Sequence, residues 1–215
     1  MFNLYLLGVI FIDKISHYIK NFLFPDNAYL DTILLEEERR VGINPSIGIE
    51  AGKLLGLIIR LMKAKRVLEF GTCLGFSTIC IAEALRESGG KLISIEKNKD
   101  MYDETMKNIK LAGVSDVVEL VCADAEKVIM EIKGPFDLVL QDSSKTVYLP
   151  MLERCIQLTR KGGVIIADDT LFKPMGMPAQ YSEPVDKYNE IIFFDKRLYS
   201  TILPIGDGVT ISYKK

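Results

Sequence analysis

Short apolar runs alternate with longer amphipathic stretches over most of the chain. Runs rich in Val, Ile and Leu predict buried strands, whereas apolar residues recurring three or four positions apart predict helices. The predicted strands span residues 65–70, 91–96, 117–122, 136–141, 163–168, 199–204 and 209–214. The predicted helices span residues 3–22, 28–40, 47–63, 76–87, 99–112, 125–132, 145–160 and 184–197, and Ser46 is the expected cap of the third.

The alternation of strands and helices predicts an α/β fold. Repeated strand–helix units form parallel sheets with helices on both faces, so we expect one seven-stranded, mostly parallel sheet. Asp207-Gly208 lies between the last two apolar runs and predicts a hairpin, which adds an antiparallel strand at the C-terminus. A length of 215 residues suits one domain with a short extension. Ligands of such sheets bind beyond the carboxyl ends of the strands.

The segment 67–78 carries the most specific signal. A short apolar strand runs into a turn with Gly71 and Gly75, and a helical pattern follows from Phe76. Gly71 lets the backbone approach a ligand closely because it has no Cβ. The G-x-x-x-G spacing differs from the G-x-G-x-x-G motif of pyrophosphate binders and from the lysine-containing motif of triphosphate binders. We therefore expect an adenosyl ligand without phosphates, and S-adenosylmethionine is the leading candidate.

Two acids follow the next predicted strands. Glu96 can accept hydrogen bonds from both ribose hydroxyls, or it can be a solvated strand-end carboxylate next to Asn98 as a helix cap. The glycine turn favours the ribose interpretation. Asp124 can cap the following helix, accept from the adenine amino group, or do both.

Three aspartates follow the fourth and fifth predicted strands. Asp142, Asp168 and Asp169 should meet because these strand ends are neighbours. Carboxylates placed together repel unless a cation neutralises them, and hard oxygen ligands suit Mg²⁺, Mn²⁺ or Ca²⁺. The alternative is ordinary turn chemistry at the strand ends. A zinc site is not expected because His17 is the only histidine, and we expect it to be a packing or surface residue.

Lys145 follows Asp142 by three residues, at the start of a predicted helix. A helix N-terminus and a bound cation both disfavour its positive charge, which eases the loss of its proton. A lysine in that position can act as a general base, whereas the alternative is a surface lysine. The flanking acidic residues favour the interpretation of Lys145 as a general base.

Composition narrows the functional class. A net charge of −2 gives no electrostatic reason to expect nucleic acid. Four cysteines, Cys73, Cys80, Cys122 and Cys155, lie in apolar segments without a C-x-x-C motif. They indicate buried thiols in a reducing compartment, and hence a cytoplasmic protein, rather than a disulfide framework.

The N-terminal segment is densely apolar from Phe2 to Ile12. It is shorter than the roughly 20 residues that span a bilayer, and it lacks the features of a signal peptide. Apolar residues of segment 4–22 recur in one helical stripe. We expect this helix to pack on its own domain or on a second subunit, with interfacial membrane contact as the alternative.

The motifs together resemble a known family. From about residue 40 to 215 the chain is similar to the class I S-adenosylmethionine-dependent O-methyltransferases, in the metal-dependent branch that includes catechol O-methyltransferase and caffeoyl-CoA O-methyltransferase. The resemblance rests on residues 64–72 with Gly75-Phe76-Ser77, residues 136–139 with Asp142 and Lys145, Gly162-Gly163 before Asp168-Asp169, residues 203–208, and the terminal Lys214-Lys215.

The resemblance implies a Rossmann-like fold and a role for each matching residue. The positions that match cofactor-binding residues are Glu69, Gly71, Thr72, Gly75, Ser77, Glu96, Asp124, Ala125 and Asp142, with Ser77 near the methionine carboxylate. Asp142, Asp168 and Asp169 match the metal ligands, and Lys145 with Asp142 matches the catalytic pair. It further implies that residues 46–215 form the methyltransferase domain, that residues 1–45 supply lid, substrate or dimer contacts, and that the protein is a homodimer.

Three departures from the family pattern are notable. Asp169 stands where the family usually has Asn, which makes the site one charge more negative and should tighten metal binding while acidifying the bound hydroxyl less. Ser143-Ser144 replace bulkier residues, so the acceptor pocket can differ. Segment 171–178 is either an acceptor-side wall or a plain surface connection.

The reaction expected is therefore methyl transfer from S-adenosylmethionine to a hydroxyl of a small catechol-like acceptor, assisted by a divalent cation, most simply Mg²⁺, and by Lys145. The alternatives are a different hydroxylated metabolite as acceptor and a cofactor-binding interaction module without catalysis. A nicotinamide dehydrogenase is disfavoured by the glycine spacing.

Overall fold

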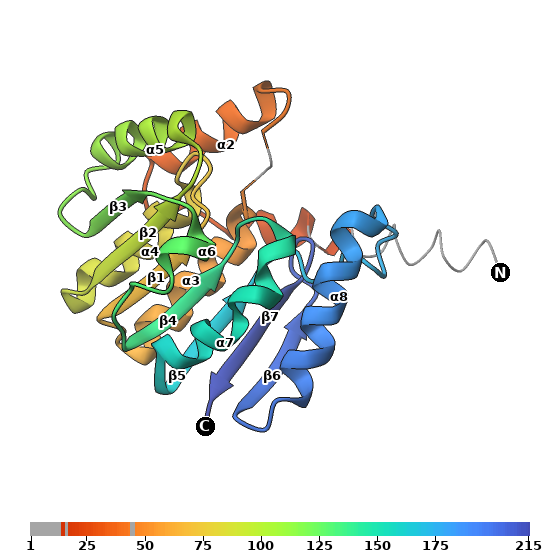
Figure 1. The fold of residues 1–215 in the computed structure, drawn as a ribbon. Helices are drawn as coiled ribbons and strands as arrows, with labels where there is room; N and C mark the ends of the chain where they lie inside the picture. The colour runs from red at the N-terminus through yellow and green to blue at the C-terminus, as the bar shows by residue number, and fades with distance from the viewer. Residues whose placement is uncertain (1–13, 16, 44–45) are drawn as a thin grey trace.

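A computed structural model describes residues 14–15, 17–43 and 46–215 (Figure 1). A seven-stranded sheet runs through the molecule in the order β3-β2-β1-β4-β5-β7-β6. Its strands are β1 (Arg66–Phe70), β2 (Lys91–Glu96), β3 (Val118–Cys122), β4 (Phe136–Gln141), β5 (Thr159–Ala167), β6 (Leu198–Leu203) and β7 (Val209–Lys214). Strands β1 to β5 are parallel to one another, and β7 is antiparallel to both β5 and β6, so the predicted α/β fold is confirmed.

Helices cover both faces of the sheet (Figure 1). They are α2 (Tyr29–Arg39), α3 (Gly48–Met62), α4 (Phe76–Ser88), α5 (Lys99–Leu111), α6 (Ala125–Val128), α7 (Tyr148–Leu158) and α8 (Ala179–Phe194), with a 3₁₀ turn at Lys145–Val147. Leu138 and Leu140 of β4 belong to one core cluster with α2 to α5, whereas Val139 belongs to a second cluster with α7 and α8. This split follows from the alternation of side chains along a strand.

Most predicted elements are confirmed to within two residues, and the last helix is the main exception. The prediction placed it over residues 184–197. In the structure α8 begins at Ala179, with Pro184 inside it, and ends at Phe194. The amides of Tyr181 and Ser182 donate to the carbonyl of Pro178, so the first turn forms before Pro184 is reached.

Three smaller expectations are also corrected. Ser46 does not cap α3; its amide and hydroxyl donate to Glu37 instead. The helix expected over 125–132 is α-helical only to Val128. The helix expected over 145–160 begins as a 3₁₀ turn and ends at Leu158, because β5 already starts at Thr159 and bulges before it pairs regularly with β4.

The sequence also predicted an N-terminal helix and four buried thiols, and the structure describes part of that helix. Of the helix predicted over 3–22, residues 14–15 and 17–20 are helical and 21–22 form a turn, while residues 1–13 and 16 lie outside those described. Cys80 and Cys155 are buried free thiols, as predicted, whereas Cys73 is only partly buried and Cys122 is exposed. Within the described part of the chain, no helix is long and apolar enough to cross a bilayer.

Candidate active site

The glycine turn between β1 and α4 is built around two close backbone approaches. Gly71 has φ +93°, and a Cβ there would lie 2.3 Å from the carbonyl oxygen of Asp142. Gly75 has φ +91°, and a Cβ there would lie 3.0 Å from Thr105 Cγ2. Both conformations favour glycine, and both positions leave no room for a side chain. The backbone conformation of this turn therefore favours glycine at both positions of the G-x-x-x-G motif.

Hydrogen bonds to β2 and α5 hold the turn in place. The amide and hydroxyl of Thr72 both donate to Glu96 Oε2, at 3.1 and 3.2 Å. The amide of Asn98 donates to Glu96 Oε1 at 2.8 Å, and Asn98 caps α5, as predicted. Thr105 Oγ1 donates to the carbonyl of Cys73 at 2.7 Å. Glu96 therefore accepts three hydrogen bonds, which leaves about one acceptor site open, because a carboxylate can accept about four.

Beneath the turn lies a buried carboxylate. Glu69 has no exposed surface, and its oxygens accept hydrogen bonds from the hydroxyls of Ser77, Thr78 and Ser94 at 2.5–2.6 Å. Burial raises the pKa of Glu69 to about 7, although the three hydroxyl donors oppose that shift. Ser77 is itself only 4% exposed. Glu69 therefore fixes the first turn of α4 from below instead of facing the open end of the sheet.

Asp124 lies at the end of β3 and caps α6. Its side chain accepts from the amide of Glu126 at 3.1 Å and pairs with Lys97 at 2.7 Å. The hydrogen bond from Lys97 lowers the pKa of Asp124 below its ordinary value. The predicted cap is confirmed, and Ala125 begins the helix next to it.

Asp142, Asp168 and Asp169 meet at the carboxyl ends of β4 and β5, as the sequence predicts. Each can offer one carboxylate oxygen within 4.8 Å of the others. The amide of Asp142 donates to the carbonyl of Phe70, and the amide of Asp168 donates to that of Gln141. These bonds extend the strand pairing into the site. Asp169 has φ +59°, a conformation that aspartate and asparagine tolerate better than most residues.

The three aspartates of the triad carry more negative charge than the neighbouring positive groups neutralise. Burial, together with the charges of Asp142 and Asp169, raises the pKa of Asp168 to about 9. Burial also raises the pKa of Asp142 to about 6. Oxygen ligands at this separation suit a hard divalent cation, which would remove the repulsion. The residues present therefore fit a metal ion.

Lys145 lies among these carboxylates. Its Nζ is 3.2 Å from Asp142 Oδ1, 2.9 Å from Asp169 Oδ2 and 2.8 Å from the hydroxyl of Tyr148. Burial lowers the pKa of Lys145, but the charges of Tyr148, Asp142 and Asp169 outweigh it and hold this pKa well above its ordinary value. The expected depression of the pKa is thus not met while the carboxylates carry their full charge.

Tyr148 is a site residue that the sequence analysis missed. It is fully buried, and its hydroxyl accepts from Lys145 and donates to the carbonyl of Asp168 at 3.2 Å. Its ring packs edge-on against Tyr188, with centroids 5.6 Å apart. The available signal was the spacing of three residues from Lys145, which brings two side chains together on one helical face.

The C-terminal hairpin turn is bonded to the segment that follows the triad. The amide of Thr170 donates to the carbonyl of Gly208 at 2.9 Å, and the amide of Leu171 donates to that of Asp207 at 2.8 Å. Burial raises the pKa of Asp207, and the charge of Asp169 adds to the shift. The sequence pattern predicted the hairpin but not this contact.

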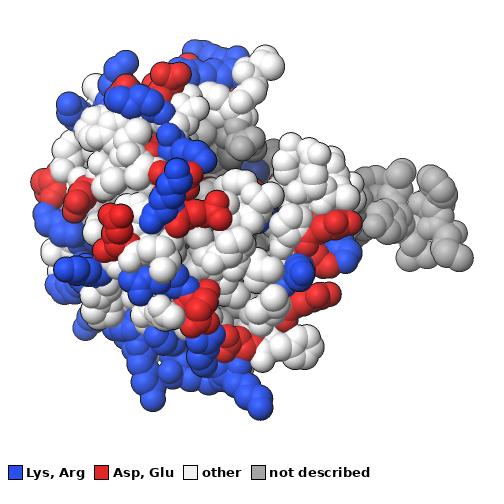
Figure 2. Space-filling view, in the orientation of Figure 1, with Lys and Arg blue, Asp and Glu red and all other residues white. Residues whose placement is uncertain are grey.

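Charge differs between the two ends of the sheet. Lys65, Lys91 and Lys161 are exposed where parallel strands begin, and Figure 2 shows basic side chains gathered at that lower end. Some of them bind carbonyls near helix ends; Lys65 Nζ, for example, donates to Ser88. The triad lies at the opposite end, so an incoming cation is drawn to the carboxyl ends of the strands.

Comparisons with known proteins show the family of the chain. Residues 25–215 match the family model described as O-methyltransferase. The chain is 31% identical over 183 residues to the caffeoyl-CoA O-methyltransferase of Populus kitakamiensis, covering 77% of each chain. It is 28% identical over 182 residues to the flavonoid 3',5'-methyltransferase of Vitis vinifera, again covering 77% of each.

Solved structures share the fold. The SAH-bound methyltransferase PaMTH1 of Podospora anserina aligns with a TM-score of 0.83 at 22% identity, covering 95% of both chains. The O-methyltransferase of Bacillus cereus in complex with SAH aligns with a TM-score of 0.79 at 24% identity, covering 94% of this chain and 97% of that one.

Proposed function

The chain belongs to the O-methyltransferase family, and we propose that this S-adenosylmethionine-dependent enzyme methylates one hydroxyl of a small catechol-like acceptor, with a divalent cation and Lys145 assisting. One observation carries the proposal. Three aspartate oxygens suited to a cation lie within 4.8 Å of one another, and Asp142 is in backbone contact with Gly71 of the glycine turn. Methyl donor and chelated acceptor can therefore meet in one place.

The cofactor would lie over the glycine turn. Gly71, Thr72 and Gly75 bring backbone close to it, and Glu96 would accept from the ribose at its remaining acceptor site, on Oε1 beside the bond from Asn98. Asp124 and Ala125 would border the adenine. Ser77 would lie near the methionine carboxylate, and Glu69 would contribute by positioning Ser77, because Glu69 has no exposed surface.

Asp142, Asp168 and Asp169 would hold the cation, most simply Mg²⁺, with Mn²⁺ or Ca²⁺ as alternatives of the same ligand preference. When bound, the cation supplies a chelation point for two adjacent hydroxyls and lowers their pKa. Catechols present that pair of oxygens, which favours them over simple phenols.

Lys145 would take the acceptor proton at its Nζ. It is 10% exposed and held by Asp142, Asp169 and Tyr148, so its position is fixed next to the triad. Its pKa must fall before it can accept a proton, and neutralising the carboxylates would lower it. Holding donor and acceptor in line contributes much of the rate.

The test compares acceptors at saturating S-adenosylmethionine and Mg²⁺. Product is measured by mass spectrometry for a set of catechols and for the matched phenols that lack the second hydroxyl. We expect methylation of catechols at rates at least about tenfold above those of the phenols. Equal rates for both sets would contradict the chelated acceptor.

We further propose a cytoplasmic homodimer in which residues 1–45 contribute lid, substrate or dimer contacts. Its support is the free thiols at Cys80, Cys122 and Cys155 and the exposed apolar side chains of Ile15, Tyr18 and Phe22. Size-exclusion chromatography with and without residues 1–22 tests the assembly, and a monomeric full-length chain would contradict it.

A further inference from the structure

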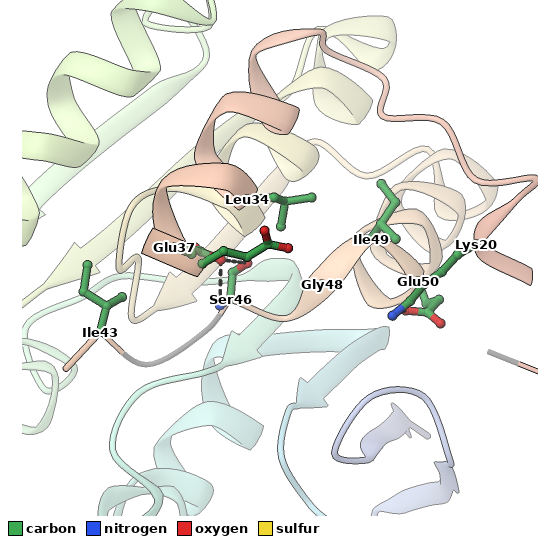
Figure 3. Close-up of a pocket in the computed structure, with 9 residues that line it drawn as sticks. Lys20, Leu34, Glu37, Ile43, Ser46, Gly48, Ile49 and Glu50 are labelled. Atoms are coloured by element: carbon green, nitrogen blue, oxygen red, sulfur yellow. Dashed lines mark hydrogen bonds and ion pairs between the residues drawn. The ribbon is translucent and has the colours of Figure 1, made fainter. Parts of the chain in front are cut away.

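A cavity of about 420 Å³ opens between the end of α2 and the start of α3 (Figure 3). Its lining includes Glu37, Ile43, Ser46 and Gly48. Lys20 also borders the cavity, and its ammonium lies 3.7 Å from a carboxylate oxygen of Glu50. The residues that line this cavity do not belong to the sequence motifs of the candidate active site.

The carboxylate of Glu37 is held at one oxygen only. Its Oε2 accepts from the hydroxyl of Ser46 at 2.8 Å and from the amide of Ser46 at 3.2 Å. Its Oε1 is buried and has no hydrogen-bond partner within the described residues. Burial raises the pKa of Glu37, and the two bonds from Ser46 oppose that rise. A buried carboxylate oxygen without a partner is costly, so a donor that reaches it gains free energy.

A chain of backbone contacts leads from the wall of the cavity to the segment that follows the triad. The carbonyl oxygen of Ile47 is 4.0 Å from the position that a Cβ would take at Gly206, in the C-terminal hairpin turn. That turn is bonded to the segment that follows Asp169. The negative charge of Glu37 also contributes to the raised pKa values of Asp142 and Cys73, which lie at the triad and in the glycine turn.

We propose that Glu37 is a specificity-determining residue that selects methyl acceptors by charge, favouring a cationic side group and rejecting an anionic one. The inference rests on the proposed function, because it assumes that the acceptor binds at the triad. An ammonium group supplies N–H donors and a positive charge to Oε1 of Glu37. A carboxylate or phosphate group in the cavity meets the like charge of Glu37.

The experiment measures binding to the full chain loaded with S-adenosylhomocysteine and Mg²⁺. Calorimetry compares three catechols of similar length that carry an ethylammonium, an ethyl or an acetate side chain. For the unaltered protein we expect the ammonium form to bind about tenfold tighter than the ethyl form, and the acetate form about tenfold weaker.

Glu37→Gln should bring all three affinities to within about threefold of one another, because the amide keeps the shape and removes the charge. Asp31→Asn is the matched control: it removes one exposed charge from the same helix and should leave the order intact. Repeating the series on the unaltered protein at high salt gives a second reading, in which the spread should shrink.

The possible outcomes distinguish failure of the charge selection from failure of the proposed function. If the ethyl catechol binds and is methylated but side-chain charge has no effect, or if Glu37→Gln keeps the full spread, the charge selection is overturned and the proposed function stands. If no catechol binds, both are overturned. If Glu37→Gln does not fold, the series on the unaltered protein decides: a spread that shrinks with salt supports the inference, and no spread overturns it.

Discussion

The Cβ that Gly71 lacks would lie 2.3 Å from the carbonyl oxygen of Asp142. The turn proposed to hold the methyl donor is thus in direct backbone contact with a proposed metal ligand. The amide of Asp142 also donates to the carbonyl of Phe70, the residue before Gly71, at 2.9 Å. The two halves of the site cannot move independently.

Gly71→Ala should therefore disrupt both halves at once. The new methyl group clashes with backbone at Asp142, and φ +93° is unfavourable for alanine. We expect a loss of at least about 2 kcal/mol in unfolding free energy, together with loss of S-adenosylhomocysteine and Mg²⁺ binding. Urea unfolding and calorimetry measure these. Gly89→Ala is the control, because Gly89 also has positive φ but nothing within 4 Å, so only about 1 kcal/mol should be lost.

Glu69 predicts a pH dependence of stability. Its pKa is about 7 in the folded chain against 4.5 as a free side chain, so folding favours its protonated form. The stability it contributes is present in full below pH 4.5 and is lost as the pH rises through about 7. The loss amounts to about 3 kcal/mol. Urea unfolding between about pH 4 and pH 8 should show a gap between the unaltered chain and Glu69→Gln that changes by this amount; parallel curves would contradict it.

Asp169→Asn tests the extra charge at the triad. Asparagine tolerates the φ of +59° and keeps the side-chain shape, so the change is mainly electrostatic. We expect Mg²⁺ affinity to fall about tenfold, because one anionic ligand is lost. The activity profile should move to lower pH, since a less neutralised cation acidifies the acceptor hydroxyl more. Unchanged metal affinity and an unchanged profile would refute this.

Tyr148→Phe tests the positioning of Lys145. It removes the hydroxyl that links Lys145 to the carbonyl of Asp168, at a cost of about 1–2 kcal/mol in stability. We expect kcat to fall while S-adenosylhomocysteine binding stays the same. Tyr188→Phe is the matched control, because the Tyr188 hydroxyl is buried without a partner among the described residues, and its removal should cost nothing. Equal effects of the two changes would count against the role of Tyr148.

The strands of the sheet and the meeting of the three aspartates could be predicted from local sequence patterns. Apolar runs fixed the strands, and because parallel strands end at one edge, the meeting of Asp142, Asp168 and Asp169 followed from their order. The start of α8 was misplaced because Pro184 is tolerated inside the helix once Ala179 begins it. The local sequence pattern gives no indication that α8 begins at Ala179.

Long-range contacts account for the rest. That Glu69 is fully buried depends on hydroxyls from α4 and β2, and Ser46 bonds Glu37 in place of capping α3. The raised pKa of Lys145 depends in part on Asp169, 24 residues later in the chain, whereas the predicted lowering rests on the helix N-terminus together with a bound cation. Such side-chain partners are set by packing and are invisible to periodicity.

The most direct test of the central claim is the cation requirement of methyl transfer. The initial rate of catechol methylation is measured at saturating S-adenosylmethionine, first in EDTA and then with increasing Mg²⁺. The account predicts no product in EDTA and full recovery on adding Mg²⁺, with Asp168→Asn needing far more of the cation. Equal rates in EDTA and in Mg²⁺ would contradict it.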